Sequence, residues 1–333
     1  MKISLITVCY NSAATIRGTM ESVALQEVEK KGGGGEKVEI EYIVVDGGST
    51  DGTVDIIRDF EKKVLYLKSQ VSSFKSQVSS LKSQVSSLTS DVSRPRPGHG
   101  CNLVFRWISE KDRGMYDALN KGIAMATGDV IGILNADDRL EDERVLVDVA
   151  GAFQVEGCKF QVSGCRSQVS GCGLQGDGCK LQGDGSGASV DCVYGDIRFA
   201  RDGKTVRYYG AKRWKPWMFQ WGKMPPHPGV YIRREYFAKY GGYKLGYYIA
   251  ADYELLIRFM RKHAIRARYL NKCLVCMGLG GRSTKNWKSN LILNQEIVRA
   301  NRENGYFCCL PMLVPKYFFK IWEFILPKLG FKV

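Results

Sequence analysis

Short apolar runs rich in β-branched residues alternate along this chain with longer segments in which apolar residues recur every three or four positions. The apolar runs predict strands at residues 3–9, 38–45, 103–109, 130–134 and 192–199. The periodic segments predict helices at residues 13–26, 53–63, 115–126, 143–153, 234–240, 253–263 and 288–304. This order of strands and helices is typical of an α/β fold with a mostly parallel central sheet flanked by helices.

Two repetitive segments interrupt the alternation, at about residues 64–101 and 155–189. In the first segment, apolar residues recur at spacings of four and three, which is the heptad spacing of a coiled coil: Leu67, Val71, Phe74, Val78, Leu81, Val85, Leu88 and Val92. However, the repeat is rich in serine, which has poor helix propensity, and no complementary charges flank the apolar positions. We therefore favour a flexible insertion over an oligomerisation arm.

The second repetitive segment places four cysteines seven residues apart among glycine, glutamine and serine: Cys158, Cys165, Cys172 and Cys179. Structural zinc sites use cysteine pairs that are only about two to four residues apart, so we interpret this segment as a loop. Both segments, and a glycine run at residues 32–35, fall between a predicted helix and the next strand. In such folds ligands bind beyond the carboxyl ends of the strands, so all three insertions should project away from the active site.

The composition is that of a globular protein, with 333 residues of which 44% are apolar and 25% charged. Met1 and Lys2 lead directly into the first strand pattern and not into a secretory signal, so we expect a cytoplasmic protein whose eleven cysteines are reduced. A formal net charge of +15 favours an anionic partner such as nucleic acid, a membrane surface or a phosphorylated substrate. No segment reaches the roughly 18 to 20 uncharged residues of a membrane-spanning helix, so membrane contact would be peripheral.

Residues 306–333 form a C-terminal extension that is aromatic and basic. A helix over residues 315–327 would place Lys316, Lys320 and Glu323 on one face and aromatic side chains on the others. Two interpretations stay open: a helix at the inner face of the cytoplasmic membrane, or a helix packed against the core of a single domain at residues 1–305.

Polar residues gather where the first four predicted strands end, and the carboxyl ends of parallel strands are where α/β proteins bind ligands. The residues are Thr7, Tyr10, Asn11, Asp46, Asp112, Arg113, Asn135, Asp137 and Asp138. After Asp46 the chain turns through glycines into a helix, a junction at which free backbone N–H groups can bind a nucleotide.

Asp137 and Asp138 follow the apolar run at residues 130–134, so a buried strand ends in two adjacent like charges. Such a pair favours a cation, and Mg²⁺ or Mn²⁺ held by one or two carboxylates and by phosphate oxygens is a common solution. The alternative is that Asp138 caps a helix and Asp137 pairs with a lysine.

Five motifs give the chain a specific resemblance. They are TVCYN at 7–11, VVDGGSTDGT at 44–53, EKDRGMYDALNKG at 110–122, LNADD at 134–138 and AADYELLIR at 250–258. In this order they resemble the family 2 glycosyltransferases of the GT-A (Rossmann-like) fold, in the branch that assembles bacterial polysaccharides. The match extends over residues 1–258, apart from the insertions.

The resemblance implies roles for individual residues. Thr7, Tyr10, Asn11, Asp46, Asp112 and Arg113 would cradle the base and ribose of a nucleotide-diphosphate sugar, with Asn135 at the first position of the usual Asp-x-Asp motif. Asp137, with Asp138, would hold Mg²⁺ or Mn²⁺ on the diphosphate. Asp252 would be the catalytic base, and Ala251 stands where the family usually has glutamate. An aspartate at this position can also cap the following helix.

Further residues are candidates for contact with the acceptor or with phosphate. His227 lies in a proline-rich loop, Trp217 and Trp221 lie in an aromatic and basic stretch, and Arg282 follows two glycines. Sugars stack on aromatic rings, but each of these residues could instead have a structural role.

The resemblance therefore implies an inverting enzyme that transfers a sugar to a glycan or lipid-linked acceptor. We expect transfer of a single sugar, because the motif of processive family members is absent. A sugar nucleotidyltransferase and a catalytically inactive nucleotide-sugar-binding protein remain alternatives. The chain has no recognisable RNA-binding motif, so we do not expect a nucleic acid partner.

Overall fold

The computed structural model describes residues 1–29, 37–82, 103–154, 189–201, 204–278 and 287–317. One sheet runs through the molecule in the order β3-β2-β1-β4-β8-β6-β9-β5, and β7 pairs with β6 outside this path. Six of its strands run in one direction, so the expected mostly parallel α/β fold is confirmed.

The parallel part of the sheet contains the strands that the apolar runs predict. Its members are β1 (Lys2–Cys9), β2 (Glu39–Asp46), β3 (Leu103–Ser109) and β4 (Val130–Ile133). In register, Cys9 lies opposite Asp46, and Asp46 lies opposite Ser109, so three strands end at the same level. The loops that follow them are therefore brought together at one edge.

The second part of the sheet is mixed, and most of it is not evident from the sequence pattern. β6 (Cys192–Arg201) is close to its prediction, whereas the remaining strands were not predicted: β5 (Arg139–Leu140), β7 (Lys204–Tyr209), β8 (Val230–Arg233) and β9 (Ala267–Met277). These strands are short or have many partly exposed positions, so they lack a clear apolar run. β8 runs antiparallel to both β4 and β6, and its start therefore lies at the edge where β4 ends.

Seven α-helices are described: α1 (Ile16–Ala24), α2 (Thr53–Lys82), α3 (Met115–Met125), α4 (Val145–Gln154), α5 (Arg234–Tyr240), α6 (Ala251–Ile257) and α7 (Trp287–Glu303). A π-helical turn, η3 (Arg258–Lys262), follows α6, and three short 3₁₀ segments complete the list: η1 (Pro216–Trp221), η2 (His227–Gly229) and η5 (Leu310–Leu313). Helix α6 begins two residues earlier than predicted, so Asp252 lies within its first turn.

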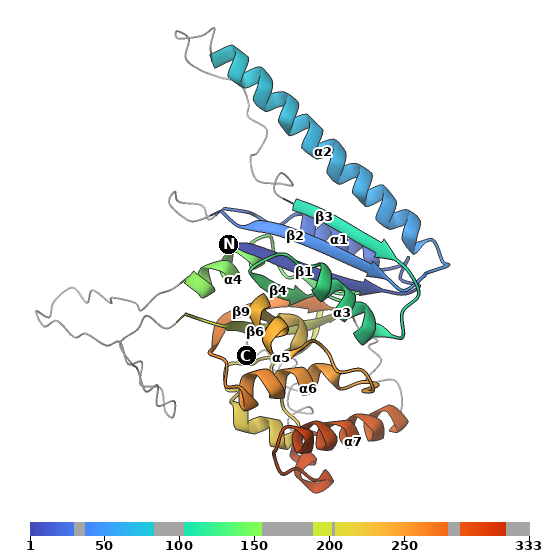
Figure 1. The fold of residues 1–333 in the computed structure, drawn as a ribbon, viewed down its shortest axis with the longest axis vertical. Helices are drawn as coiled ribbons and strands as arrows, with labels where there is room; N and C mark the ends of the chain where they lie inside the picture. Colours follow the sequence, from blue (N-terminus) through green and yellow to red (C-terminus); the bar gives the residue numbers. More distant parts are fainter. Residues whose placement is uncertain (30–36, 83–102, 155–188, 202–203, 279–286, 318–333) are drawn as a thin grey trace, which may run out of the picture.

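Helix α2 differs most from its prediction, because it continues to Lys82 and does not end at residue 63. The first part of the expected flexible insertion is therefore helical, and Figure 1 shows this helix extending past the end of the sheet. The remainder of that insertion, the cysteine repeat and the glycine run lie mostly or wholly outside the described residues.

Two apolar layers cover the two faces of the sheet. One layer joins the sheet to α1, α2 and α4, and the other joins it to α3, α5, α6 and α7. Alternate residues of β1 divide between the layers, with Ile3 and Leu5 in the first and Ile6 and Val8 in the second. The described start of the C-terminal extension packs on the second layer through Cys308 and Leu313. None of the helices in the described ranges has the length and apolarity to cross a bilayer.

Glu41 on β2 is a buried carboxylate that links three parts of the fold. Its oxygens accept hydrogen bonds from Ser4 Oγ at 2.5 Å and from the Thr127 N–H and Oγ1, both at 2.8 Å. Lys2 and Arg106 lie 3.4 and 3.5 Å away as ion-pair partners. Burial opposes the charge, but these hydrogen bonds and Lys2 outweigh it and lower the pKa of Glu41 to about 2.

Replacing Glu41 should therefore destabilise the fold in a pH-dependent way. We expect Glu41→Gln to lower the free energy of unfolding by about 2–3 kcal/mol in urea titrations at pH 7. The folded-state pKa lies below the ordinary value, so the contribution is fully present above pH ~4.5 and is lost as the pH falls towards 2. Glu39→Gln, at an exposed position of the same strand, is the control. Equal urea midpoints for both variants would contradict this account.

Candidate active site

The turn after β2 is built around the carboxylate of Asp46. Asp46 is fully buried and accepts hydrogen bonds from the N–H groups of Gly48 and Ser49, from the Ser49 hydroxyl, and from Ser109 Oγ at 2.7 Å. Burial disfavours the charge, but these donors outweigh it and hold the pKa of Asp46 below its usual range. Asp46 therefore shapes the loop, and a ligand would meet the loop's outer surface.

The loop after β1 is joined to the loop after β2 by side chains from both. Asn11 has a left-handed backbone (φ 49°), accepts a hydrogen bond from the Thr50 N–H at 3.0 Å, and donates its own N–H to Ser49 Oγ. Asp51 accepts from the Ala13 N–H across the same gap. This arrangement leaves the Tyr10 side chain 60% exposed at the edge of the sheet.

Gly47 is the point where three of the loops come closest together. A Cβ atom added to Gly47 would lie 2.6 Å from Asp112 Oδ2 and 3.5 Å from Tyr10 Cδ2. Asp112 is held by the Gly114 N–H, which donates to its Oδ1 at 2.8 Å, so Oδ2 faces Gly47. Arg113 is exposed and pairs with Asp117 at 3.1 Å. Buried Gly47 thus leaves room for the exposed Tyr10 ring and the partly exposed Asp112 carboxylate, which together form a polar and aromatic surface.

The two aspartates after β4 have different environments. Asp137 is exposed, whereas Asp138 is fully buried and accepts a hydrogen bond from Asn135 Nδ2 at 2.8 Å. Burial, followed by the charge of Asp137, raises the pKa of Asp138 to about 7. Of the two carboxylates, only Asp137 is open to a ligand in this structure.

Asp252 lies in the first turn of α6 and is partly buried, with the Tyr253 N–H donating to its Oδ1 at 2.8 Å. Burial is the main reason that the pKa of Asp252 rises to about 6, and the negative charge of Glu296 adds to it. In turn, burial and then the Asp252 charge raise the pKa values of Tyr116 and Tyr243. Asp252 is therefore a partly buried carboxylate near two tyrosines, and its raised pKa suits a proton acceptor near neutral pH.

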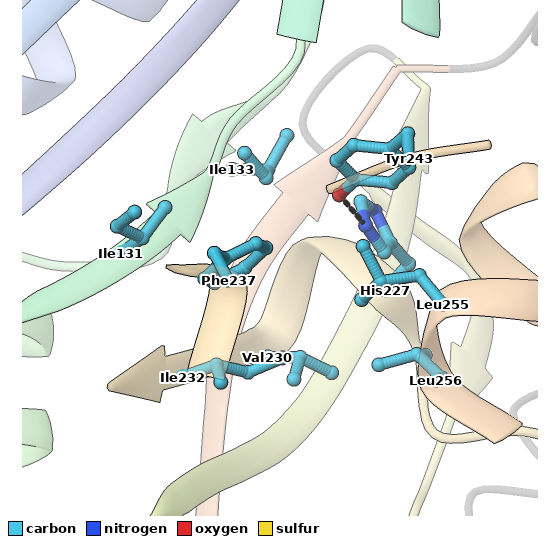
Figure 2. A pocket seen from close by; sticks show the side chains of 9 residues that line it. All are labelled: Ile131, Ile133, His227, Val230, Ile232, Phe237, Tyr243, Leu255 and Leu256. Atoms are coloured by element: carbon cyan, nitrogen blue, oxygen red, sulfur yellow. Dashed lines mark hydrogen bonds between the residues drawn. The ribbon is translucent and has the colours of Figure 1, made fainter. Parts of the chain in front are cut away.

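His227 and Tyr243 make a second polar contact at this end of the sheet. His227 Nε2 lies 2.6 Å from Tyr243 Oη, and Figure 2 shows the pair at the wall of a small apolar cavity. Burial lowers the pKa of His227 to about 4, so the imidazole is neutral at pH 7. Tyr243 stacks on Tyr116 with 5.7 Å between ring centroids, and Asn120 holds the Tyr243 backbone through two hydrogen bonds of 2.8 Å.

The same cavity brings the end of β4 next to α6. Ile133 at the end of β4 and Leu255 of α6 both line it (Figure 2). Ile133 precedes the loop that carries Asp137, and Leu255 is on the helix that carries Asp252. The two carboxylates therefore project from elements that are packed against each other.

Comparisons with known proteins bear on the family and the fold of this chain. The sequence model named glycosyl transferase family 2 matches residues 4–77 and 103–166. A PGL/p-HBAD biosynthesis glycosyltransferase of Mycobacterium tuberculosis is 25% identical over 89% of this chain and 82% of its own length. Over the matched residues this chain is similar to the family 2 glycosyltransferases.

Two solved structures share the fold of this chain. S. aureus TarS 1–349 in complex with UDP-GlcNAc has a TM-score of 0.52 at 15% identity, covering 90% of this chain and 68% of TarS 1–349. A mannosyltransferase from Pyrobaculum calidifontis in complex with GDP-Man and Mn²⁺ has the same TM-score and identity, covering 90% of this chain and 63% of its own. The expected GT-A fold is thereby confirmed.

The residues of the candidate site fit a divalent metal only in part. Within the described ranges, no cluster of three or more His, Cys, Asp or Glu side chains forms a site made by protein alone. One exposed carboxylate, Asp137, nevertheless fits Mg²⁺ or Mn²⁺, which are commonly held by one or two carboxylates with substrate phosphates. Asp137 would hold the ion, while Asn135 and buried Asp138 would support the loop.

Two residues expected in the site are not among those exposed at the edge of the sheet. The Thr7 side chain is fully buried and its Oγ1 accepts a hydrogen bond from the Tyr42 hydroxyl, so its contact with the donor stays a prediction. Successive side chains of a strand point to opposite faces of the sheet, and this alternation turns the Thr7 side chain into the core. The position of Thr7 near the end of a strand did not indicate this. Arg282 lies outside the described residues.

Trp217 and Trp221 lie on η1 and are 54% and 39% exposed. The segment is tied to α6, because the Tyr253 hydroxyl donates to the Phe219 carbonyl and the two rings are 5.3 Å apart. The aromatic stretch is thus divided, with Phe219 buried and the two tryptophans open to contact.

Sequence reasoning missed Tyr116, Asn120, Tyr243 and Glu296, which surround or support Asp252. Tyr116 and Asn120 belong to the EKDRGMYDALNKG motif, which was a signal for them. Nothing in the pattern around Tyr243 or Glu296 indicated a role, because their contacts join segments far apart in the chain.

Gly47 offers a direct test of the surface formed with Tyr10 and Asp112. In Gly47→Ala the new methyl group must displace the Asp112 carboxylate, so we expect the donor KM to rise about tenfold, or ~1.4 kcal/mol of binding. Gly151→Ala is the control, since a Cβ there has open space. Initial rates across a donor concentration series measure the effect, and an unchanged KM would exclude this surface from donor binding.

Proposed function

We propose that this chain is a metal-dependent, inverting glycosyltransferase that moves one sugar from a nucleotide-diphosphate sugar to a glycan or lipid-linked acceptor during cell-surface polysaccharide biosynthesis. The observation that supports the proposal is that exposed Asp137 follows β4 and partly buried Asp252 lies on α6, a helix that lines the same cavity as the end of β4. The similarity to the PGL/p-HBAD biosynthesis glycosyltransferase of Mycobacterium tuberculosis and to a poly-beta-1,6-N-acetyl-D-glucosamine synthase of Staphylococcus epidermidis supports the polysaccharide or glycolipid context.

The chemistry assigns a separate task to each part of the site. Tyr10, Asn11, Asp112 and Arg113 are exposed or partly exposed and would hold the nucleotide, with Asp46 fixing their loop. Asp137 would hold the divalent ion, whose charge stabilises the departing diphosphate. Asp252 would accept the proton of the acceptor hydroxyl as its oxygen attacks the anomeric carbon from the face opposite the leaving group.

Asp252→Asn should abolish transfer while sparing donor binding. The amide cannot accept the proton, so we expect kcat to fall about 10²- to 10⁴-fold with the donor affinity within twofold. In the wild-type enzyme, Asp252 is active as a carboxylate, and its pKa of about 6 predicts that kcat falls as the pH drops below 6. Steady-state rates from pH 5 to 8, with donor affinity by calorimetry, measure both effects.

Measuring sugar transfer and donor binding together also distinguishes the proposed function from two other functions. A catalytically inactive nucleotide-sugar-binding protein would bind the donor but show no transfer in the wild-type chain. A sugar nucleotidyltransferase would release pyrophosphate from a nucleoside triphosphate and a sugar phosphate. Full transfer activity in Asp252→Asn would show that the proposed base is wrong.

Asp137 provides the test of metal dependence. We expect chelation to remove activity, Mn²⁺ or Mg²⁺ to restore it, and Asp137→Asn to raise the metal concentration for half-maximal rate about 10- to 100-fold. The exposed Asp129→Asn is a control carboxylate, since Asp129 accepts the Lys2 N–H at the opposite edge of β1. Undiminished activity after chelation would contradict a metal-held diphosphate.

For the acceptor, we infer contact with Trp217 and Trp221, because both rings are exposed on a segment anchored to α6. Sugar rings stack on such side chains. His227 would act through Tyr243, since its Nε2 already contacts that hydroxyl, and Arg282 would meet phosphate.

Membrane association is the remaining part of the proposal. The net charge of +15 and the aromatic and basic residues 306–333 support a peripheral position at the inner face of the cytoplasmic membrane. We expect the chain to co-sediment with vesicles containing phosphatidylglycerol but not with neutral phosphatidylcholine vesicles. Lys320→Glu combined with Lys328→Glu should weaken this binding, and equal binding to both vesicle types would contradict the charge-based interpretation.

A further inference from the structure

The three residues that lead into α6 are held by one carboxylate from a distant helix. Glu296 on α7 accepts hydrogen bonds from three successive backbone N–H groups: Tyr248 at 2.5 Å, Ile249 at 2.9 Å and Ala250 at 2.9 Å. Asp252 follows this loop by two residues. A single side chain therefore fixes the path of the backbone just before the proposed base.

A second helix holds the same loop from another direction. The Tyr116 hydroxyl on α3 donates a hydrogen bond to the Ile249 carbonyl. Ile249 is thus bound through its N–H by α7 and through its carbonyl by α3. The Asp252 carboxylate accepts a hydrogen bond from the adjacent Tyr253 N–H, which belongs to the same helix. The location of this carboxylate therefore depends on the position of the α6 backbone.

We propose that Glu296 is a positioning residue for catalysis, which sets the location of Asp252 by fixing the backbone of residues 248–250. This inference rests on the proposed function of Asp252 as the base. Because the loop precedes a short helix, loss of one N–H acceptor would allow α6 to shift, and small displacements of a reacting group reduce rates strongly.

Glu296 also acts on Asp252 through its charge. The groups that face Asp252 are Tyr116 from α3, Tyr243 from the preceding loop and Glu296 from α7. Both tyrosines stay neutral, so Glu296 is the charged neighbour among these three. Its negative charge favours the protonated form of Asp252, and its removal should lower the pH at which Asp252 becomes active.

The experiment compares Glu296→Gln, Glu296→Asp and the exposed neighbour Gln295→Ala in the full-length chain. For Glu296→Gln we expect kcat to fall about 10- to 100-fold, the donor KM to stay within twofold, and the acidic limb of the pH profile to move to lower pH. Glu296→Asp keeps the charge but shortens the reach, so kcat should fall without that shift. Gln295→Ala should match the wild type.

A double-variant cycle distinguishes a positioning effect on kcat from a general loss of folded protein. Tyr116→Phe removes the other contact to Ile249, and its effect on kcat should combine with that of Glu296→Gln non-additively, because both act on one peptide unit. Unchanged kcat in Glu296→Gln would overturn the proposal. So would a loss that follows only the folded fraction measured by thermal melting, with an unshifted pH limb.

Asp252→Asn, measured in parallel, separates this inference from the function on which it rests. If Asp252→Asn is inactive and Glu296→Gln is fully active, only the role of Glu296 is wrong. If Asp252→Asn retains full activity, the proposed base is wrong, and with it the positioning role of Glu296.

Discussion

The hydrogen-bond register of the parallel strands is the constraint on which the site depends. With Cys9, Asp46 and Ser109 at one level, the three loops that follow must share one edge of the sheet. Asp46 then converts this proximity into a defined shape, because its buried carboxylate binds donors from its own loop and from β3. The surface around Gly47 is a direct result of that packing.

The antiparallel strand β8 extends the same edge into the second half of the chain. It pairs between β4 and β6 in the reverse direction, so the residues before it, including His227, arrive beside the loop that follows β4. The cavity lined by Ile133 and Leu255 shows α6 packed against this junction. Residues more than a hundred positions apart therefore contribute to one region.

The sequence was sufficient for the first half of the fold because β1 to β4 are apolar runs bounded by turns, and their loops carry family motifs. The sequence was insufficient for β7 and β9, whose partly exposed positions give no period, and for the orientation of Thr7. The contacts of Glu296 and Tyr243 could not be derived either, because long-range packing brings their partners together.

Helix α2 contains the start of the seven-residue repeat and carries it away from the sheet edge where Asp46 lies. It starts beside the loop after β2 and runs back against the strand direction, so its far end emerges on the opposite side of the molecule from Asp46. A seven-residue unit added to or deleted from that end spans about two helical turns and changes only the length of the helix far from Asp46. Changes of whole seven-residue units at that end therefore leave the shared edge of β1, β2 and β3 in place.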